Sequence, residues 1–204
     1  MILSPLQPDW YEQDVLSAAP ALLGKTLVRS VDGQSITARI IEVEAYRGEE
    51  DQACHARAGC TPRTQVMFGP PGRAYVYFTY GMHWCLNAVC MPAGYPAAVL
   101  IRAVAPIDGM DYIAAHRAGR PPAIWTDGPA KLTQALSING TLNGCDLSAS
   151  GGPLWIADAP AVSAEQIAVS PRIGLGATPE PWLSLPWRFY LPAEKARQRR
   201  LGKN

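Results

Sequence analysis

The sequence predicts a β-rich mixed fold of the α+β class. The 204 residues include 19 prolines and 18 glycines, which favours many turns and few long helices. Segments rich in aromatic and β-branched residues recur between short turns, as expected for strands. Apolar residues make up 48% and charged residues 17% of the chain, a balance that excludes a disordered protein. We see no internal repeat or linker and expect a single domain over residues 1–204.

The first half of the chain is expected to hold one helix and most of the strands. Residues 10–24 repeat apolar side chains at helical spacing up to Gly24, with Pro20 as a point where the helix would break. An Asp32-Gly33 turn joins two strands into a hairpin. Residues 47–72 form a loop of a length that is usually functional or disordered. The strands are expected at 25–31, 35–46, 74–80, 84–90 and 98–104.

The second half is expected to hold two short helices and three short strands. Asp127-Gly128-Pro129 precedes the second helix, where a cap and an early proline are favourable. We expect the domain core at about 22–191 and a basic C-terminal tail at 193–204. The helices are expected at 109–118 and 130–138, and the strands at 154–157, 172–175 and 188–191.

Charge is unevenly distributed along the sequence, although the formal net charge is only +1. No Asp or Glu occurs between Gln52 and Ile107, a stretch that contains four arginines. The C-terminal tail carries two lysines and three arginines against Glu194 alone. Such local basic regions on a nearly neutral chain are compatible with a nucleic-acid partner.

The five cysteines and the first residues indicate a reducing compartment. The cysteine count is odd, and Met1-Ile-Leu-Ser-Pro lacks the basic and apolar regions of a signal peptide. We expect reduced thiols in an intracellular protein, in the cytoplasm or nucleoid if the source is bacterial. No apolar run reaches the ~18 residues of a membrane span, so we expect no membrane partner.

Glu42 and Glu44 lie two residues apart on a predicted strand, so their side chains share a face. Periodicity places Ile36, Ala38 and Ile40 on that same face, where two carboxylates are unexpected. One interpretation is that the strand leaves the core near its end and both carboxylates are solvated. The other interpretation is functional, with a carboxylate pair or a single general base at the end of the strand.

Tyr75, Tyr77 and Tyr80, together with Phe78, form an aromatic block on a predicted strand. By itself such a block more often packs in a core or a hairpin. Next to an arginine-containing stretch without carboxylates, it is also suited to stacking on nucleobases.

The sequence lacks the common motifs for metals and nucleotide cofactors. Cys54-His55 with Cys60 matches no common zinc spacing, so we expect no metal site. A GxSxG elbow, a phosphate loop and a GxGxxG fingerprint after a strand are all missing, and we expect no cofactor. Lys131, at a predicted helix start, is either a phosphate ligand or an ordinary exposed lysine.

A longer series of motifs follows a fixed order along the chain. It contains Glu42-Val-Glu44-Ala-Tyr46, His55, Thr61-Pro-Arg63, Met67-Phe68, Tyr75-Val-Tyr77-Phe-Thr-Tyr80-Gly-Met82, Asn87, Leu100-Ile-Arg102-Ala, Gly128-Pro-Ala-Lys131-Leu, Ala135-Leu-Ser-Ile-Asn139, Arg172-Ile-Gly-Leu-Gly176 and Arg188-Phe-Tyr190. This series resembles the alkyladenine (3-methyladenine) DNA glycosylase family over roughly residues 22–191. One motif alone would be weak evidence, whereas the full ordered series is specific.

The resemblance implies a mixed domain with a curved antiparallel sheet. It also implies an enzyme that flips a damaged purine out of duplex DNA and hydrolyses its N-glycosidic bond, leaving an abasic site. In this family pattern Glu44 would be the general base, and Arg102 would help to hold the nucleophilic water. An alkylated purine is already cationic and leaves easily, so one carboxylate suffices to activate water and stabilise the oxocarbenium-like sugar.

The resemblance further implies a pocket for the flipped base. Tyr46 and Tyr77 would stack on the base, with His55 beside them, and Asn87 would exclude purines that bear a 2-amino group. Tyr80 would insert into the duplex where the base had been. Aromatic walls favour positively charged rings through cation–π attraction, and normal bases cost more to flip because they are better paired.

The expected partner is double-stranded DNA containing damaged purines, with water as the nucleophile and the protein acting as a monomer. Because phosphate contacts supply much of the affinity for DNA, we expect a modest number of basic side chains at the DNA backbone. Arg63, Lys131 and Arg172 are the candidates for these contacts.

Two alternative functions stay open on the sequence alone. A module that recognises damaged DNA without cutting it would share the tyrosines and arginines but would not need Glu44. A carbohydrate-active hydrolase could use Glu42 and Glu44 as an acid and base pair, since such residues lie about 6–7 Å apart along a strand. The second alternative leaves Tyr80 unexplained.

Overall fold

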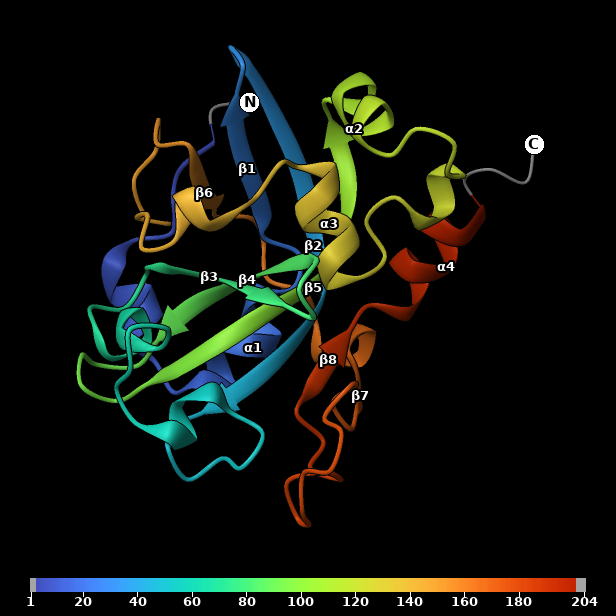
Figure 1. Cartoon of the computed structure of the whole chain (residues 1–204). Helices are drawn as coiled ribbons and strands as arrows, with labels where there is room; N and C mark the ends of the chain where they lie inside the picture. The colour runs from blue at the N-terminus through green and yellow to red at the C-terminus, as the bar shows by residue number, and fades with distance from the viewer. Residues whose placement is uncertain (1–2, 201–204) are drawn as a thin grey trace.

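One open antiparallel β-sheet organises the fold (Figure 1). The computed structural model describes residues 3–200, and in this part of the chain the eight strands follow the order β3-β4-β5-β2-β1-β6, while β8 pairs with both β2 and β7. The α+β class expected from the sequence is confirmed. The strands are β1 (Thr26–Val31), β2 (Gln34–Arg47), β3 (Ala74–Thr79), β4 (His83–Cys90), β5 (Ala97–Asp108), β6 (Leu154–Ala157), β7 (Ala168–Ser170) and β8 (Arg188–Tyr190).

Short helices surround the sheet. Helix α1 buries Val15, Ala18 and Leu22, and α3 buries Leu132 and Ala135. None of the helices in residues 3–200 has both the length and the apolar character required to cross a membrane. The α-helices are α1 (Val15–Leu22), α2 (Met110–His116), α3 (Pro129–Ala135) and α4 (Pro192–Arg200), and the 3-10 helices are η1 (Pro8–Glu12), η2 (His55–Ala58), η3 (Gln65–Phe68), η4 (Pro122–Ile124), η5 (Gly140–Leu142) and η6 (Ala164–Gln166).

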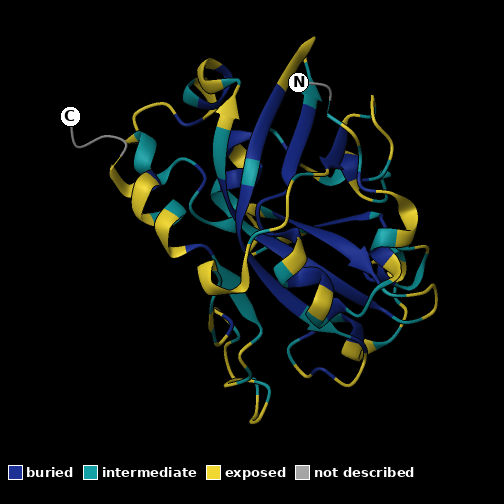
Figure 2. Ribbon diagram, turned by 180° about the vertical axis from the view of Figure 1, so that it is seen from behind, coloured by how far each residue is buried: buried dark blue, intermediate teal, exposed yellow. Residues whose placement is uncertain are grey.

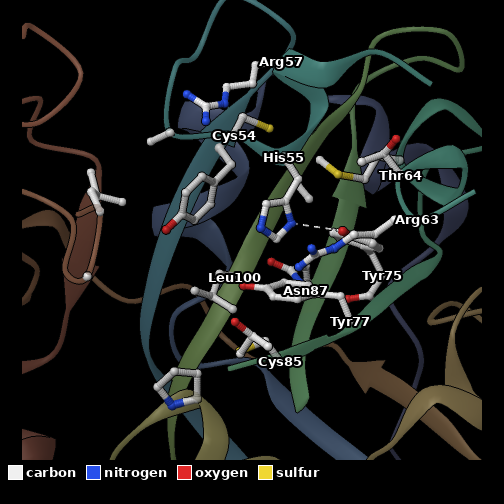
Figure 3. Close-up of a pocket in the computed structure, with 18 of the residues that line it drawn as sticks. Cys54, His55, Arg57, Arg63, Thr64, Tyr75, Tyr77, Cys85, Asn87 and Leu100 are labelled. Atoms are coloured by element: carbon white, nitrogen blue, oxygen red, sulfur yellow. Dashed lines mark hydrogen bonds between the residues drawn. The ribbon is translucent and has the colours of Figure 1, made fainter. Parts of the chain in front are cut away.

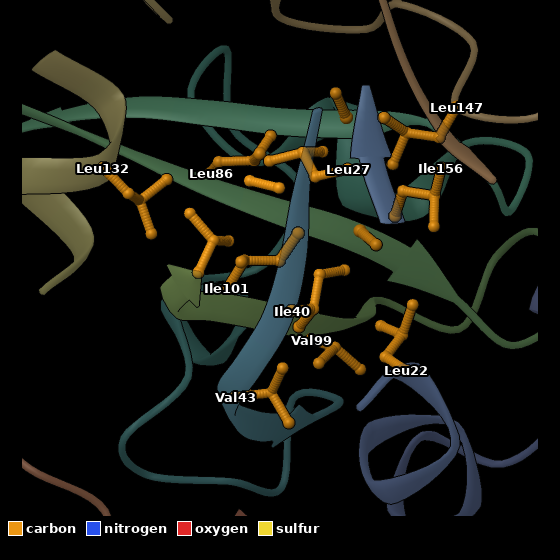
Figure 4. Close-up of a cluster of buried hydrophobic side chains, with 14 of the residues drawn as sticks. Leu22, Leu27, Ile40, Val43, Leu86, Val99, Ile101, Leu132, Leu147 and Ile156 are labelled. Carbon is orange, nitrogen blue, oxygen red and sulfur yellow. The ribbon is translucent and has the colours of Figure 1, made fainter. Parts of the chain in front are cut away.

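The main hydrophobic core lies on one face of the sheet. Leu86 of β4 and Val99 of β5 pack there with Leu22 of α1 and Leu132 of α3 (Figure 4). Figure 2 shows that buried residues are concentrated on the strands, whereas exposed residues lie mostly on loops and outer helix faces. Each fully buried aliphatic side chain of this kind stabilises the fold by roughly 1.5–3 kcal/mol. The alternate strand residues point to the other face, where a smaller cluster forms around Tyr75.

A β-bulge changes the orientation of β2 halfway along its length. Ile40 pairs with Val104 and Glu42 pairs with Ala103, so Ile41 has no partner on β5. An extra residue in a strand inverts which of the following positions face the core. The residues of β2 in the main core are accordingly Ile36, Ala38, Ile40 and Ile41 up to the bulge, then Val43 and Ala45 after it.

The bulge determines on which face of the sheet Glu42 and Glu44 lie. The two carboxylates do share a face, but the expectation that this is the face of Ile36, Ala38 and Ile40 is wrong. Because Val43 and Ala45 occupy the core after the bulge, Glu42, Glu44 and Tyr46 point to the opposite side of the sheet.

The predicted strands match the observed strands with one exception. The Asp32-Gly33 hairpin and the strand at 154–157 are confirmed. The strand predicted at 172–175 is wrong, because these residues are irregular and β8 pairs with β7 instead. The physical reason is local: the Arg172 side chain enters an ion pair with Asp51, and the Ile173 N–H donates to Glu44 and not to a neighbouring strand.

The helices differ from prediction mainly at their boundaries. The helix predicted at 10–24 is two elements, η1 and α1, because Gln13 is extended and the Asp14 side chain caps α1 by accepting from the Leu16 N–H. Pro20 does not break α1, which continues to Leu22. The helices predicted at 109–118 and 130–138 are present with shorter bounds. The tail predicted at 193–204 contains α4 up to Arg200, and its residues 201–204 lie outside the described residues.

Candidate active site

A cavity of about 570 Å³ lies on the face of the sheet opposite the main core (Figure 3). Strands β2, β3, β4 and β5 line it with residues two positions apart, because alternate residues of a strand share a face. Residues of the segments 52–67 and 173–178, together with Tyr80 and Pro129, complete the lining. The contributing strand residues are Tyr46, Tyr75, Tyr77, Thr79, Cys85, Asn87, Ala98, Leu100 and Arg102.

Glu44 lies directly behind the cavity lining and is 0% exposed. Its Oε2 accepts hydrogen bonds from the Tyr46 hydroxyl at 2.9 Å and from Nη1 of Arg102 at 3.1 Å. Its Oε1 accepts from the backbone N–H of Ile173 at 2.7 Å. All three partners line the cavity. Since a carboxylate oxygen can accept two hydrogen bonds, Oε1 keeps one acceptor position not used by the described residues.

Burial raises the pKa of the Glu44 carboxyl above its ordinary value. The Arg102 guanidinium, the Ile173 N–H and the Tyr46 hydroxyl oppose this shift without cancelling it. A carboxylate with a raised pKa is a better proton acceptor than an exposed glutamate. The site therefore combines a buried base with an adjacent cation that keeps the charged form accessible.

Glu42 differs chemically from Glu44, although only one residue separates them. It is 3% exposed and contacts three cations: Arg102 at 3.2 Å, Arg188 at 2.6 Å and Lys195. Burial by itself would raise the pKa of Glu42, but hydrogen bonds from Lys195 and Arg188 lower it overall. Glu42 is thus held ionised, which does not suit a general acid. The interpretation that Glu42 and Glu44 are both solvated is wrong, because both are buried.

His55, Tyr75 and Tyr77 form an aromatic wall of the cavity (Figure 3). Nδ1 of His55 lies 3.0 Å from the Tyr75 hydroxyl, and the His55 ring meets Tyr77 edge-on with the centroids 4.5 Å apart. Burial, with the charges of Arg63 and Arg57, lowers the pKa of His55 to about 4. The imidazole is therefore neutral near pH 7, so this wall carries no charge of its own.

Tyr46 and Asn87 contribute to the lining in fixed orientations. The Tyr46 hydroxyl is bound to Glu44, which holds the ring against the carboxylate. The Asn87 amide donates to the Tyr75 carbonyl at 2.9 Å, and the residue is 4% exposed. Both side chains thus reach the cavity from rigid strands, which favours a fixed binding geometry.

Tyr80 projects from the turn between β3 and β4 and is 79% exposed. Its φ is +51° and that of Gly81 is +66°, and the Met82 N–H closes the turn by donating to the Thr79 carbonyl at 3.2 Å. Positive φ at both central residues produces a tight hairpin turn. The aromatic block predicted on this strand is therefore divided, since Tyr75 is buried, Phe78 packs against Trp84 and Tyr80 reaches solvent.

The three cations predicted at the DNA backbone have different surroundings. Arg63 is exposed, lines the cavity and places its guanidinium carbon 5.2 Å from the Tyr77 ring centroid. The Lys131 side chain is 41% exposed and pairs with Asp127 at 2.7 Å. Arg172 is different, because its side chain is fully buried against Asp51. It has no surface with which to reach a phosphate, so its predicted role at the DNA backbone is wrong.

Sequence reasoning missed several residues of the site. Cys85 lines the cavity two positions before Asn87 on the same strand, so strand alternation was a usable signal for it. Ile173 contributes a backbone N–H, which every residue except proline has, so its residue type gives no signal in the sequence. Asp51 and Arg172 are 121 residues apart, and no local pattern links them.

The cysteine and histidine residues of the 54–60 segment do not converge. Cys54 is buried, Cys60 is exposed and His55 bonds to Tyr75. Over residues 3–200, no group of three or more His, Cys, Asp or Glu side chains is arranged to hold a metal ion. The five cysteines of the chain are free.

The fold and the site are those expected of a DNA glycosylase, an enzyme that hydrolyses N-glycosyl bonds, and the match to a protein family shows that the chain is of this class. An antiparallel sheet presents an aromatic cavity, a buried carboxylate and an exposed tyrosine beside it. The chain belongs to the Methylpurine-DNA glycosylase (MPG) family, whose model matches residues 9–195. The family resemblance of the ordered motifs is thereby confirmed.

Several relatives are similar to this chain over nearly its whole length. A protein of Methanocella arvoryzae is 50% identical over 188 residues, covering 91% of this chain and 92% of the relative. One of Carboxydothermus hydrogenoformans is 47% identical over 190 residues, covering 93% and 96%. One of Chlorobaculum parvum is 42% identical over 211 residues, covering 97% and 98%. Each carries the name "Putative 3-methyladenine DNA glycosylase".

Proposed function

We propose that the protein flips alkylated or deaminated purines, 3-methyladenine among them, out of double-stranded DNA and hydrolyses the N-glycosidic bond. The product is an abasic site. One observation carries the proposal: the buried Glu44 is hydrogen-bonded to three residues that line an aromatic cavity of about 570 Å³. A cavity of this volume is in the usual range for small-molecule sites. Because one chain supplies every proposed group, we expect a monomer to be active.

Glu44 is proposed to act as the general base toward water. The unused acceptor position on Oε1, next to the Ile173 N–H, is where a water molecule would donate a proton. Arg102 would orient that water and keep Glu44 ionised until the proton moves. The carboxylate would also stabilise the positive sugar that forms as the bond breaks. Catalytic hydrogen bonds of this kind often tighten only when substrate is bound.

The aromatic cavity is proposed to select the base. Tyr46 and Tyr77 would stack on the two faces of the flipped purine, with the neutral His55 at its edge and Asn87 excluding purines with a 2-amino group. Cation–π attraction favours a positively charged alkylpurine over a normal base. Normal bases also resist flipping, since they are better paired and stacked.

Tyr80 is proposed to fill the gap that the flipped base leaves in the duplex. Its exposure and its position on a tight turn support this role, because the ring reaches solvent without any change in the core. Arg63 and Lys131, both accessible, are proposed to contact phosphates near the lesion. Such contacts position the protein on the duplex.

No specific observation favours either of the two alternative functions. A carbohydrate-active hydrolase would need Glu42 to hold a proton as general acid, whereas hydrogen bonds from Lys195 and Arg188 lower the pKa of Glu42. A module that only binds damaged DNA would not require a general base, whereas Glu44 lies behind the cavity and has a raised pKa. One assay distinguishes both alternative functions from the proposed function.

The assay is incubation of the protein with duplexes that each contain one damaged purine, followed by chromatography of the released base. Free base from 3-methyladenine or hypoxanthine duplexes, with an intact abasic strand left behind, supports the proposal. Binding without any released base contradicts it. Glu44→Gln protein in the same assay identifies background hydrolysis.

A further inference from the structure

Arg172 and Asp51 form a buried ion pair behind one wall of the cavity. Nη1 and Nη2 of Arg172 lie 2.5 Å and 2.9 Å from the two carboxylate oxygens of Asp51, and neither side chain is exposed. The guanidinium carbon is 4.7 Å from the Tyr46 ring centroid and 4.9 Å from that of Trp187. Tyr46 lines the cavity, whereas Arg172 and Asp51 do not. The guanidinium therefore covers one face of Tyr46 and leaves the other for a ligand.

Backbone hydrogen bonds fix this ion pair to the surrounding chain. Arg172 donates to two carbonyls, and the Asp51 carboxylate accepts from two backbone N–H groups. A bidentate pair with this many further partners cannot rotate or withdraw without leaving buried charges unsatisfied. The ring of Tyr46 is thus supported from behind by a rigid group. The backbone partners are Ala45 O at 3.0 Å, Trp182 O at 3.2 Å, Arg47 N at 3.2 Å and Ala53 N at 2.9 Å.

The charge of the ion pair affects which bases Tyr46 attracts. An aromatic ring binds a cation through the negative potential of its face, and a cation already on the opposite face repels a second one. Arg172 by itself would therefore make Tyr46 less receptive to a positively charged base. Asp51 offsets that charge at hydrogen-bond distance, so the net charge behind the ring is zero.

We propose that the Asp51–Arg172 pair sets the preference of the cavity between cationic and neutral damaged bases by supporting Tyr46 with a rigid group of zero net charge. The inference rests on the proposed function, since it takes a purine stacked on Tyr46 as the ligand. A purine alkylated on a ring nitrogen carries a positive charge, whereas hypoxanthine is neutral. Asp51 and Arg172 are positioning residues, because neither touches the base.

Removing one charge at a time tests this proposal. Asp51→Asn leaves Arg172 uncompensated, so excision of cationic 3-methyladenine falls relative to excision of neutral hypoxanthine. Arg172→Gln leaves the Asp51 charge alone behind Tyr46, so the same ratio rises. Coulomb's law at an effective dielectric constant of about 20 gives roughly a tenfold shift in each direction. The double variant Asp51→Asn/Arg172→Gln has no net charge at this position and returns the ratio to that of the wild type.

The measured quantity is the ratio of single-turnover rate constants for the two lesions, with folded enzyme in excess over DNA. This ratio does not depend on how much of a destabilised variant is folded. If only one of the two single variants folds, that variant still tests the proposal, because the proposal fixes the direction in which its ratio shifts. Equal losses of excision rate on both lesions, with an unchanged ratio, would show that the pair has only a structural role. That result would overturn this inference and leave the proposed function intact. A wild-type protein that releases neither base contradicts the proposed function and this inference with it.

Discussion

Nη1 of Arg102 lies 3.1 Å from Oε2 of Glu44. The same guanidinium reaches Glu42 through Nε at 3.2 Å, and Glu42 is bound in turn by Arg188 and Lys195. Arg102 is consequently oriented from both sides. Its charge stabilises the ionised form of Glu44, while Glu42 holds the guanidinium in place without contacting the cavity.

This arrangement predicts unequal effects for the two glutamates. Glu44→Gln should lower the single-turnover rate constant for base release by roughly 100- to 10,000-fold, the usual contribution of a general base. Affinity for lesion-containing duplex should stay the same or increase, because a negative charge near phosphates is removed. Glu42→Gln should be milder, since the variant loosens Arg102 but leaves the base intact. Near-normal excision by the Glu44→Gln protein would transfer the catalytic role to another residue.

The raised pKa of Glu44 predicts the acid side of the pH profile. Burial favours the protonated carboxyl, so the basic form is lost, as pH falls, at a pH above the ordinary glutamate value of about 4.3. Single-turnover excision of 3-methyladenine, measured from neutral to acid pH, should therefore decline before that value is reached. His55 has a pKa lowered to about 4 and is neutral through this range, so His55→Gln should leave the position of the decline unchanged. A decline that moves with His55→Gln would assign it to the imidazole.

Tyr80→Ala should separate catalysis from folding. Because Tyr80 is 79% exposed, its removal should change the melting temperature little, while excision from duplex DNA falls sharply. Excision from a mismatched or single-stranded site should suffer less, because less stacking opposes flipping there. Val169→Ala is a matched control, since Val169 is an exposed apolar residue on β7. A large drop in melting temperature, with equal loss on every substrate, would make Tyr80 a structural residue.

The positions of the lysines predict a monofunctional enzyme. Lys25, Lys131 and Lys195 each pair with a carboxylate, and none of them lines the cavity, while Lys203 lies outside the described residues. Strand cleavage through a Schiff base requires an amine nucleophile at the sugar. Borohydride should therefore trap no covalent protein–DNA adduct, and the product strand should break only after alkali treatment. Formation of an adduct would disprove this assignment.

Arg63 and Lys131 predict the salt dependence of DNA binding. Each phosphate contact that is lost should reduce the slope of log affinity against log salt by about one. Alanine at either position should therefore weaken binding to damaged and undamaged duplex alike, with a shallower slope in fluorescence anisotropy titrations. An unaltered slope in Arg63→Ala or Lys131→Ala would exclude that residue from the backbone contacts.

The strands were predictable because they are encoded locally. Alternation and turn residues identified the hairpin around Asp32-Gly33 and the strands on either side of Gly81. The ordered motifs, read as a family resemblance, brought Tyr46, Tyr77 and Asn87 to one cavity.

The remaining features depend on relationships that no local pattern records. The orientation of Glu44 depends on the single unpaired residue Ile41, which uninterrupted alternation does not anticipate. The contact with the DNA backbone was predicted for Arg172 for a similar reason. In the sequence, an arginine that pairs with a carboxylate 121 residues away cannot be distinguished from any other basic residue. The helix at 192–200 was missed because its polar residues show no apolar periodicity.

The backbone at Tyr80 implies that stability and function are in conflict at this turn. A tyrosine with φ of +51° is in a conformation that costs an L-residue about 1–2 kcal/mol, whereas asparagine followed by glycine is the preferred pair for such a turn. Tyr80→Asn should therefore raise the melting temperature while removing the ring. A selection for heat resistance alone would be expected to discard Tyr80, and a selection for repair would be expected to restore it.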